Sequence, residues 1–181
     1  IQRLQKLDED QLYAHSVAFG IGDALQKLGQ LDEAIEAYNK SLSFKPDYAE
    51  AYFNIGTALA AQGKFEEAIE AYTKALEIKP DFAESHNNMG LALSNAGDLE
   101  GAIQNYKLAL KFKPDYPDPY SNMGIAFMEQ GDPEAAYRCH KRALEMQPNH
   151  GGSHLNMGIV FNEMGDSEAA MRCYKRALEI E

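Results

Sequence analysis

The sequence is poor in positive charge, in cysteine and in long apolar stretches, and each shortage excludes a class of protein. Its 181 residues include 17 Lys and Arg against 28 Asp and Glu, which gives a formal net charge of −11. Binding of nucleic acid needs lysine and arginine gathered on one face, and the sequence has no basic block. No apolar run approaches the roughly 20 residues that span a bilayer. We therefore expect neither nucleic-acid binding nor membrane insertion.

The only two cysteines, Cys139 and Cys173, are 34 positions apart. This spacing recurs throughout the chain, so the two thiols are expected at equivalent places of neighbouring structural units. Stacked helices lie about 8–10 Å apart, whereas a disulfide needs Cα atoms within about 7 Å. Unpaired thiols suit a reducing compartment, and no secretion signal is visible at the start. We expect a cytoplasmic protein.

What the chain does contain is a repeat. Proline recurs at Pro46, Pro80, Pro114 and Pro148, so each step is 34 residues and no insertion disturbs the register. A fixed period of this size is typical of stacked helical repeats. Residues 1–14 are predicted to form an N-terminal helix, which either covers the first unit or ends an upstream repeat. Five units are predicted to follow, at 15–48, 49–82, 83–116, 117–150 and 151–181.

Each unit is predicted to contain two helices. In the second unit the first helix is expected from about Glu50 to Gln62, because Gly63 is the usual kind of residue just past a helix end. The second helix is expected over 65–78, since Pro80 cannot continue it. Glycine stands at the place of Gly63 in every unit, so the same division applies throughout.

The unit at 49–82 resembles the tetratricopeptide repeat (TPR) family. The matching places hold Tyr52, Ile55, Gly56, Leu59, Ala68, Tyr72, Ala75 and Pro80. The resemblance covers nearly the whole chain. It implies an all-α fold, a right-handed α-solenoid of five stacked helix-turn-helix units preceded by an extra N-terminal helix. The first helices of such units line one long inner wall, which is the surface expected to bind a partner.

One residue type marks that wall. At the sixth place of the first helix, four of the five units carry an asparagine, namely Asn54, Asn88, Asn122 and Asn156. Asparagine is a mediocre helix former, but its amide both donates and accepts hydrogen bonds. A row of amides can bind the backbone of an extended peptide, and TPR arms of O-linked sugar transferases are similar in carrying such a row. The alternative is that each asparagine bonds to the neighbouring repeat.

Apolar and acidic side chains accompany the asparagines. Leu91, Ile125 and Ile159 stand at the ninth place and are expected to face a ligand, with Met128 nearby. Glu84 and Asp118 are among six carboxylates expected on the wall, and Lys27 is the one cation. The wall should therefore prefer neutral or basic segments. At the fifth place, Phe19, Phe53 and Leu155 are expected to pack between first helices.

The same places argue against one known TPR function. Chaperone-binding TPR domains hold a C-terminal carboxylate with lysine, asparagine and arginine side chains. The corresponding places here are Phe19, Asp23, Asn54, Glu84 and Asn88, and only Asn54 agrees with that clamp. We therefore do not expect this chain to bind acidic chaperone tails.

Catalytic and metal-binding patterns are weak. His150 and His154 have the spacing of a helical metal pair, but Gly151 and Gly152 lie between them and no third ligand follows. His86 is expected at the solvated surface. Cys139 and His140 are neighbours in sequence and point about 100° apart on a helix, so they cannot act on each other. We expect no cofactor, no metal and no enzymatic activity.

Three functions stay open from the sequence. The first is a non-catalytic scaffold that binds a protein or peptide segment in a concave groove. The second is the substrate-recruiting arm of a larger enzyme such as a glycosyltransferase, which the asparagine row favours. The third is self-association into a homo-oligomer through the last helix, which no predicted polar helix covers.

Overall fold

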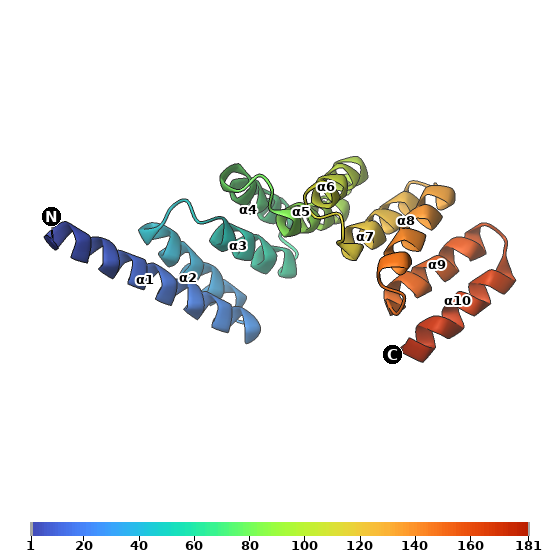
Figure 1. Cartoon of the computed structure of the whole chain (residues 1–181), viewed down its shortest axis with the longest axis horizontal. Coiled ribbons are helices and arrows are strands. Elements are labelled where there is room, and N and C mark those ends of the chain that lie inside the picture. The colour runs from blue at the N-terminus through green and yellow to red at the C-terminus, as the bar shows by residue number, and fades with distance from the viewer. Residues whose placement is uncertain (1, 181) are drawn as a thin grey trace. The chain divides into compact units, whose positions relative to one another are not determined.

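All regular structure in the part of the chain described by the computed structural model, residues 2–180, is helical (Figure 1). Side chains are described from residue 13 onward. The all-α prediction is thus confirmed. The ten helices are α1 (Gln2–Lys27), α2 (Leu31–Phe44), α3 (Ala49–Ala61), α4 (Phe65–Ile78), α5 (Ala83–Asn95), α6 (Leu99–Phe112), α7 (Pro117–Glu129), α8 (Pro133–Met146), α9 (Gly151–Glu163) and α10 (Ser167–Ile180).

The chain divides into two compact structural units, which are larger than the 34-residue repeats. From here on, the first unit is residues 1–92 and the second unit is residues 93–181. In the first unit α1 packs on α2, α2 on α3, and α3 on α4. In the second unit the same order holds from α6 to α10, each helix packing on the next. Consecutive helices from α1 to α4 and from α6 to α10 are therefore neighbours in space, as a repeat of helix hairpins requires.

The helix ends follow the turn residues. α4 has the predicted bounds, and α3 begins and ends one residue before its predicted bounds. Gly63 lies between these helices with a φ of +77°, a conformation that costs glycine little and other residues much. The glycine at the same place of the other four repeats also has a positive φ. This turn explains why the division into hairpins repeats so regularly.

The N-terminal region differs from the prediction. A separate helix is predicted over 1–14, whereas α1 runs without a break from Gln2 to Lys27. No glycine or proline occurs before Gly20 to end a helix. The first helix of the first repeat, residues 15–48, is thus longer at its N-terminal end than predicted. Residues 2–27 contain no separate helix that covers it. Ile1 and Glu181, which belong to the predicted segments at either end, lie outside the described residues.

The hairpins α1–α2, α3–α4 and α7–α8 each have a core built around a buried aromatic ring that lies over a glycine. Tyr38, Tyr72 and His140 are at equivalent places in the second helices and are at most 1% exposed. A Cβ atom added to Gly56 would lie 2.6 Å from Cε1 of Tyr72. One added to Gly124 would lie 2.6 Å from the His140 ring, so only glycine lets the two helices approach this closely.

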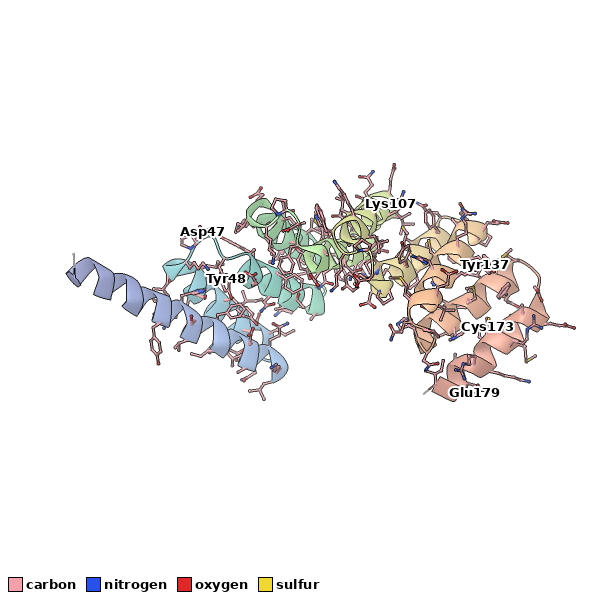
Figure 2. The ribbon with its side chains drawn as sticks, viewed as in Figure 1. Asp47, Tyr48, Lys107, Tyr137, Cys173 and Glu179 are labelled. Carbon is pink, nitrogen blue, oxygen red and sulfur yellow. The ribbon has the colours of Figure 1, made fainter. Side chains whose placement is uncertain are left out.

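Two of the predicted packing residues lie in this core. The ring of Phe19 is 4.9 Å from that of Tyr48, and the ring of Phe53 is 4.9 Å from that of Phe82. Tyr48 lies just before α3 in Figure 2. The prediction for Phe19 and Phe53 is confirmed. It is wrong for Leu155, which is 49% exposed on α9.

The cysteines lie in the second unit. Cys139 on α8 is buried, and Cys173 on α10, labelled in Figure 2, is half-buried. Both are free thiols. Burial raises the pKa of the Cys139 thiol to about 11, so this sulfur stays protonated and unreactive at neutral pH.

Candidate peptide-binding surface

The four predicted asparagines fall into one pair in each unit. Asn54 on α3 and Asn88 on α5 belong to the first unit, and Asn122 on α7 and Asn156 on α9 belong to the second. All four are half-buried. Their side chains are therefore neither sealed in the core nor fully solvated.

Asn54 hydrogen-bonds the preceding first helix. Its Nδ2 donates to Oδ1 of Asp23 on α1 at 3.0 Å. The hydroxyl of Tyr38 donates to the same carboxylate oxygen at 2.9 Å. For Asn54 the structure thus agrees with the alternative interpretation, a bond across to the neighbouring repeat that ties α3 to α1.

Asn88 also lies beside a tyrosine hydroxyl. Tyr72 on α4 has its pKa raised by burial, and side-chain hydrogen bonds with Thr57 and Asn88 oppose that shift. The distance from the Tyr72 hydroxyl to Oγ1 of Thr57 is 3.4 Å. Asn88 in addition accepts a hydrogen bond from Nδ2 of Asn87 at 3.2 Å. In the first unit, then, a buried tyrosine hydroxyl meets the ninth-place residue of its own hairpin and the asparagine of the next.

The second unit replaces that tyrosine with a histidine. His140 on α8 is 0% exposed. Neither of its ring nitrogens has a hydrogen-bond partner among the residues that the structure describes. Burial, with a smaller contribution from His150, lowers the pKa of His140 to about 4, so the imidazole is neutral at pH 7.

A small pocket opens next to this histidine. Its volume is about 100 Å³, and its walls are formed by Ile125, Met128, Glu129, His140, Asn156 and Ile159. We call it the α7–α9 pocket. Ile125 and Ile159 are 40% and 43% exposed, so the opening faces solvent. The structure here brings together four of the residues singled out from the sequence.

Sequence reasoning missed His140, although a signal was present. In the four other repeats this place holds a tyrosine, namely Tyr38, Tyr72, Tyr106 and Tyr174. A single departure from a regular column marks a place where packing changes.

The other predicted contacts lie apart from the pocket. Leu91 on α5 is 38% exposed, and Glu84 at the start of that helix is half-buried. Both belong to the first unit. Asp118 lies in the first turn of α7 in the second unit and is exposed, but it does not line the α7–α9 pocket.

The acidic character of the predicted wall is stronger in the second unit. In the first unit Glu50 forms an ion pair with Lys79 at 3.5 Å. Asp23 there accepts the hydrogen bonds described above. In the second unit Asp118, Glu129 and Glu163 are all exposed. Of these three, Glu129 lines the α7–α9 pocket, so its carboxylate can be reached by solvent and by a ligand.

The histidines near the repeat junctions have structural roles. Nδ1 of His150 accepts a hydrogen bond from the backbone N–H of Ser153 at 3.1 Å and so caps α9. Nε2 of His154 lies 2.9 Å from the carbonyl oxygen of Pro148. His86 is only 7% exposed, and its Nε2 lies 3.1 Å from the Pro80 carbonyl, so the expectation of a solvated His86 is wrong.

The described residues lack two features. No group of three or more His, Cys, Asp or Glu side chains there is placed to hold a metal ion. None of the helices within that range is long and apolar enough to cross a membrane.

Hairpins of paired helices at a 34-residue spacing, several of them with a ring packed over a glycine, define a helical-repeat protein. The family profile described as "TPR repeat" matches residues 22–63, 56–97 and 95–131, and the one described as "Tetratricopeptide repeat" matches residues 115–180. The chain belongs to the tetratricopeptide repeat family. The resemblance noted from the sequence is thereby confirmed.

Solved structures show the same fold. MamA is 25% identical, with a TM-score of 0.79 over 88% of this chain and 94% of that one. The pilF protein of Pseudomonas aeruginosa is 20% identical, with a TM-score of 0.86 over 95% and 78% of the two chains. YrrB, described as a TPR protein with an unusual peptide-binding site, is 19% identical, with a TM-score of 0.74 over 98% and 91%. Among curated proteins, no sequence match to the chain is found.

Proposed function

We propose that this protein is a non-catalytic scaffold that binds a peptide or protein segment at the α7–α9 pocket of its second unit. The observation that carries the proposal is the convergence of Ile125, Ile159 and Asn156 on one solvent-facing pocket. Two exposed isoleucines supply apolar contact, and the amide supplies hydrogen bonds that fix the register of a ligand. The similarity to YrrB, described as peptide-binding, supports the same kind of ligand.

The preferred ligand is a neutral or basic segment. Glu129 lies in the pocket wall, and Asp118 and Glu163 are exposed in the same unit. An acidic segment would bring like charges together at this surface, whereas lysine or arginine beside the inserted side chain would be attracted. For Asn88, Leu91 and Glu84 of the first unit, contact with a ligand stays a prediction.

A selected peptide tests the proposal. Nine-residue peptides would be selected from a random displayed library on the whole chain, and their dissociation constants measured by calorimetry. Ile159→Ala and Asn156→Ala should each weaken a selected peptide by about tenfold, because each removes a contact worth roughly 1–2 kcal/mol. No selectable peptide, or unchanged affinity in both variants, would overturn the proposal.

The matched control is Leu155→Ala. Leu155 is on the same helix as both tested residues and is 49% exposed, but it does not line the α7–α9 pocket. Its truncation should leave peptide affinity unchanged. Equal losses in Leu155→Ala and Ile159→Ala would place the peptide elsewhere on α9.

Self-association is a second candidate, supported by a separate surface. On α10, Met171 and Leu178 are 58% and 74% exposed. Leu155 and Leu178 also line a hollow of about 330 Å³ between α9 and α10. We propose that a second copy of the chain covers this apolar face. Sedimentation should show concentration-dependent mass in the wild type and a monomer in Leu178→Glu, whereas a monomeric wild type at every concentration would remove this candidate.

A further inference from the structure

The pocket beside His140 corresponds to a place that the first unit fills with its own hydroxyl group. There the Tyr38 hydroxyl lies 2.9 Å from Oδ1 of Asp23 and 2.7 Å from Oε1 of Gln26. Asp23 is at the ninth place of the first helix and Gln26 at the twelfth. Asn54, the sixth-place residue of the next hairpin, bonds to the same carboxylate. One phenol therefore closes the space between two successive first helices.

The second unit has the same frame without the phenol. Ile125 is at the ninth place and Met128 at the twelfth, and Asn156 is the asparagine of the next hairpin. All three line the α7–α9 pocket. His140 holds the tyrosine place, but its shorter ring ends in a nitrogen and carries no hydroxyl beyond it. The pocket therefore borders the place where the other hairpins carry a tyrosine hydroxyl.

The histidine that borders the pocket is left without a polar partner. Both ring nitrogens of His140 are buried, and neither is hydrogen-bonded within the described residues. Buried polar groups in folded proteins are nearly always paired, because an unpaired one loses its bonds to water and gains nothing. A neutral imidazole has its donor and its acceptor on different edges of the ring, so one hydroxyl cannot pair with both. His140 is 0% exposed, so its ring only closes the pocket wall, and the half-buried amide of Asn156 is the group available to a ligand hydroxyl.

We propose that the α7–α9 pocket receives a tyrosine side chain of the bound segment, with its hydroxyl hydrogen-bonded to Asn156 and its ring against Ile125 and Ile159. This inference rests on the proposed function and names the side chain that the site selects. The apolar walls and the volume of about 100 Å³ suit a phenol better than a serine hydroxyl. A carboxylate or phosphate would meet Glu129 and an uncharged imidazole, so an anionic group is disfavoured.

Small probes test the pocket apart from any peptide. p-Cresol and toluene differ only in the hydroxyl, and each would be titrated into the isotope-labelled whole chain and followed by NMR. p-Cresol should shift the His140 ring signals and the Asn156 side-chain amide, and it should bind about tenfold more tightly than toluene. Equal binding of the two probes, or shifts located away from these residues, would overturn the inference.

A variant whose own side chain fills the pocket is the matched comparison for the p-cresol titration. His140→Tyr supplies the phenol that other hairpins carry, so it should abolish p-cresol binding while raising the melting temperature. If His140→Tyr does not fold, His140→Phe and Ile159→Ala give the same test, with Leu155→Ala as the control that keeps binding. Undiminished p-cresol binding in the folded variant would contradict the inference.

The two proposals fail in different ways. If p-cresol binds as expected but no library peptide does, the pocket selects a phenol and the scaffold function is wrong. If a selected peptide depends on Ile159 and Asn156 but binds His140→Tyr with unchanged affinity, the scaffold function stands and the tyrosine inference is wrong.

Discussion

At the scale of single residues, Tyr72 and His140 show how one place in a repeat takes two roles. Both rings lie over a glycine and are almost completely buried. The Tyr72 hydroxyl meets Thr57 and Asn88, whereas the nitrogens of His140 have no partner in the described part of the chain. The same backbone therefore makes a closed hairpin in the first unit and an open pocket in the second.

His140 should make the fold sensitive to mild acid. Its pKa is lowered from 6.5 to about 4, so between these values the unfolded chain binds a proton that the folded chain does not. Stability should fall as the pH drops from 6.5 to 4, with a total loss on the order of 3 kcal/mol for a shift of this size. Urea unfolding at pH 7 and pH 4.5 measures this loss. The difference between the two pH values should be smaller in His140→Tyr, and an identical pH dependence would contradict the burial of a neutral imidazole.

Gly56 should not tolerate a side chain. A Cβ atom there would lie 2.6 Å from the Tyr72 ring, which has no room to move because it is 1% exposed. Gly56→Ala should cost about 1–3 kcal/mol of unfolding free energy, as overpacked cores do. Gly20→Ala is the control, since a Cβ there would meet nothing within 4 Å and alanine favours helix. A neutral Gly56→Ala would show that the two helices can separate at little cost.

At the scale of helices, the asparagines of different hairpins have different surroundings. Asn54 connects α3 to α1 through Asp23, which lies 31 residues earlier in the chain. Asn156 occupies the equivalent place beside a pocket whose ninth-place residue is Ile125, which cannot accept a hydrogen bond. The row of asparagines thus combines a packing role in α3 with an open, ligand-accessible place in α9.

Alanine substitutions should separate these two roles. Asn54→Ala should lower the unfolding free energy by about 1–3 kcal/mol, because it removes a donor from a partly buried carboxylate. Asn156→Ala should leave stability within about 0.5 kcal/mol, since half-buried residues outside such bonds have small effects. Thermal denaturation of both variants checks this. Equal destabilisation would mean that Asn156 is also a packing residue.

Helix positions could be predicted from the sequence because their causes are local. Gly63 and Pro80 fix the ends of α3 and α4, and the 34-residue period carries the same signals along the chain. The absence of a breaker before Gly20 is equally local, yet the N-terminal prediction relied on the repeat boundary and placed a helix end where none exists.

The surroundings of the asparagines could not be predicted in the same way. The partner of Asn54 depends on how Asp23 and Tyr38 are oriented, and these come from a different hairpin. The α7–α9 pocket lies beside His140, which has no hydroxyl group at the place where other repeats carry a tyrosine. The pattern of repeated residue types in the sequence does not reveal a group that is absent. The exposure of the ninth-place residues Ile125 and Ile159 could be predicted, because exposure on one helix face follows directly from the 3.6-residue period.

At the scale of the whole molecule, the formal net charge of −11 should steer the choice of partner. A library peptide with added lysines should bind more tightly than its glutamate counterpart at low salt. The difference should shrink between 50 mM and 500 mM NaCl, because exposed charges are screened beyond a Debye length of about 4 Å at the higher concentration. Calorimetry at both salt concentrations measures this. A preference for the glutamate peptide would contradict the proposed charge selectivity.

A peptide is proposed to bind at the surface formed by Ile125, Asn156 and Ile159. The most direct measurement is an NMR titration of the whole labelled chain with a library-selected, tyrosine-containing peptide. Chemical-shift changes should concentrate on these three residues and on the His140 ring, and they should disappear when the peptide tyrosine is replaced by alanine. Changes confined to the exposed face of α10 or to the first unit, with these signals unmoved, would contradict the account.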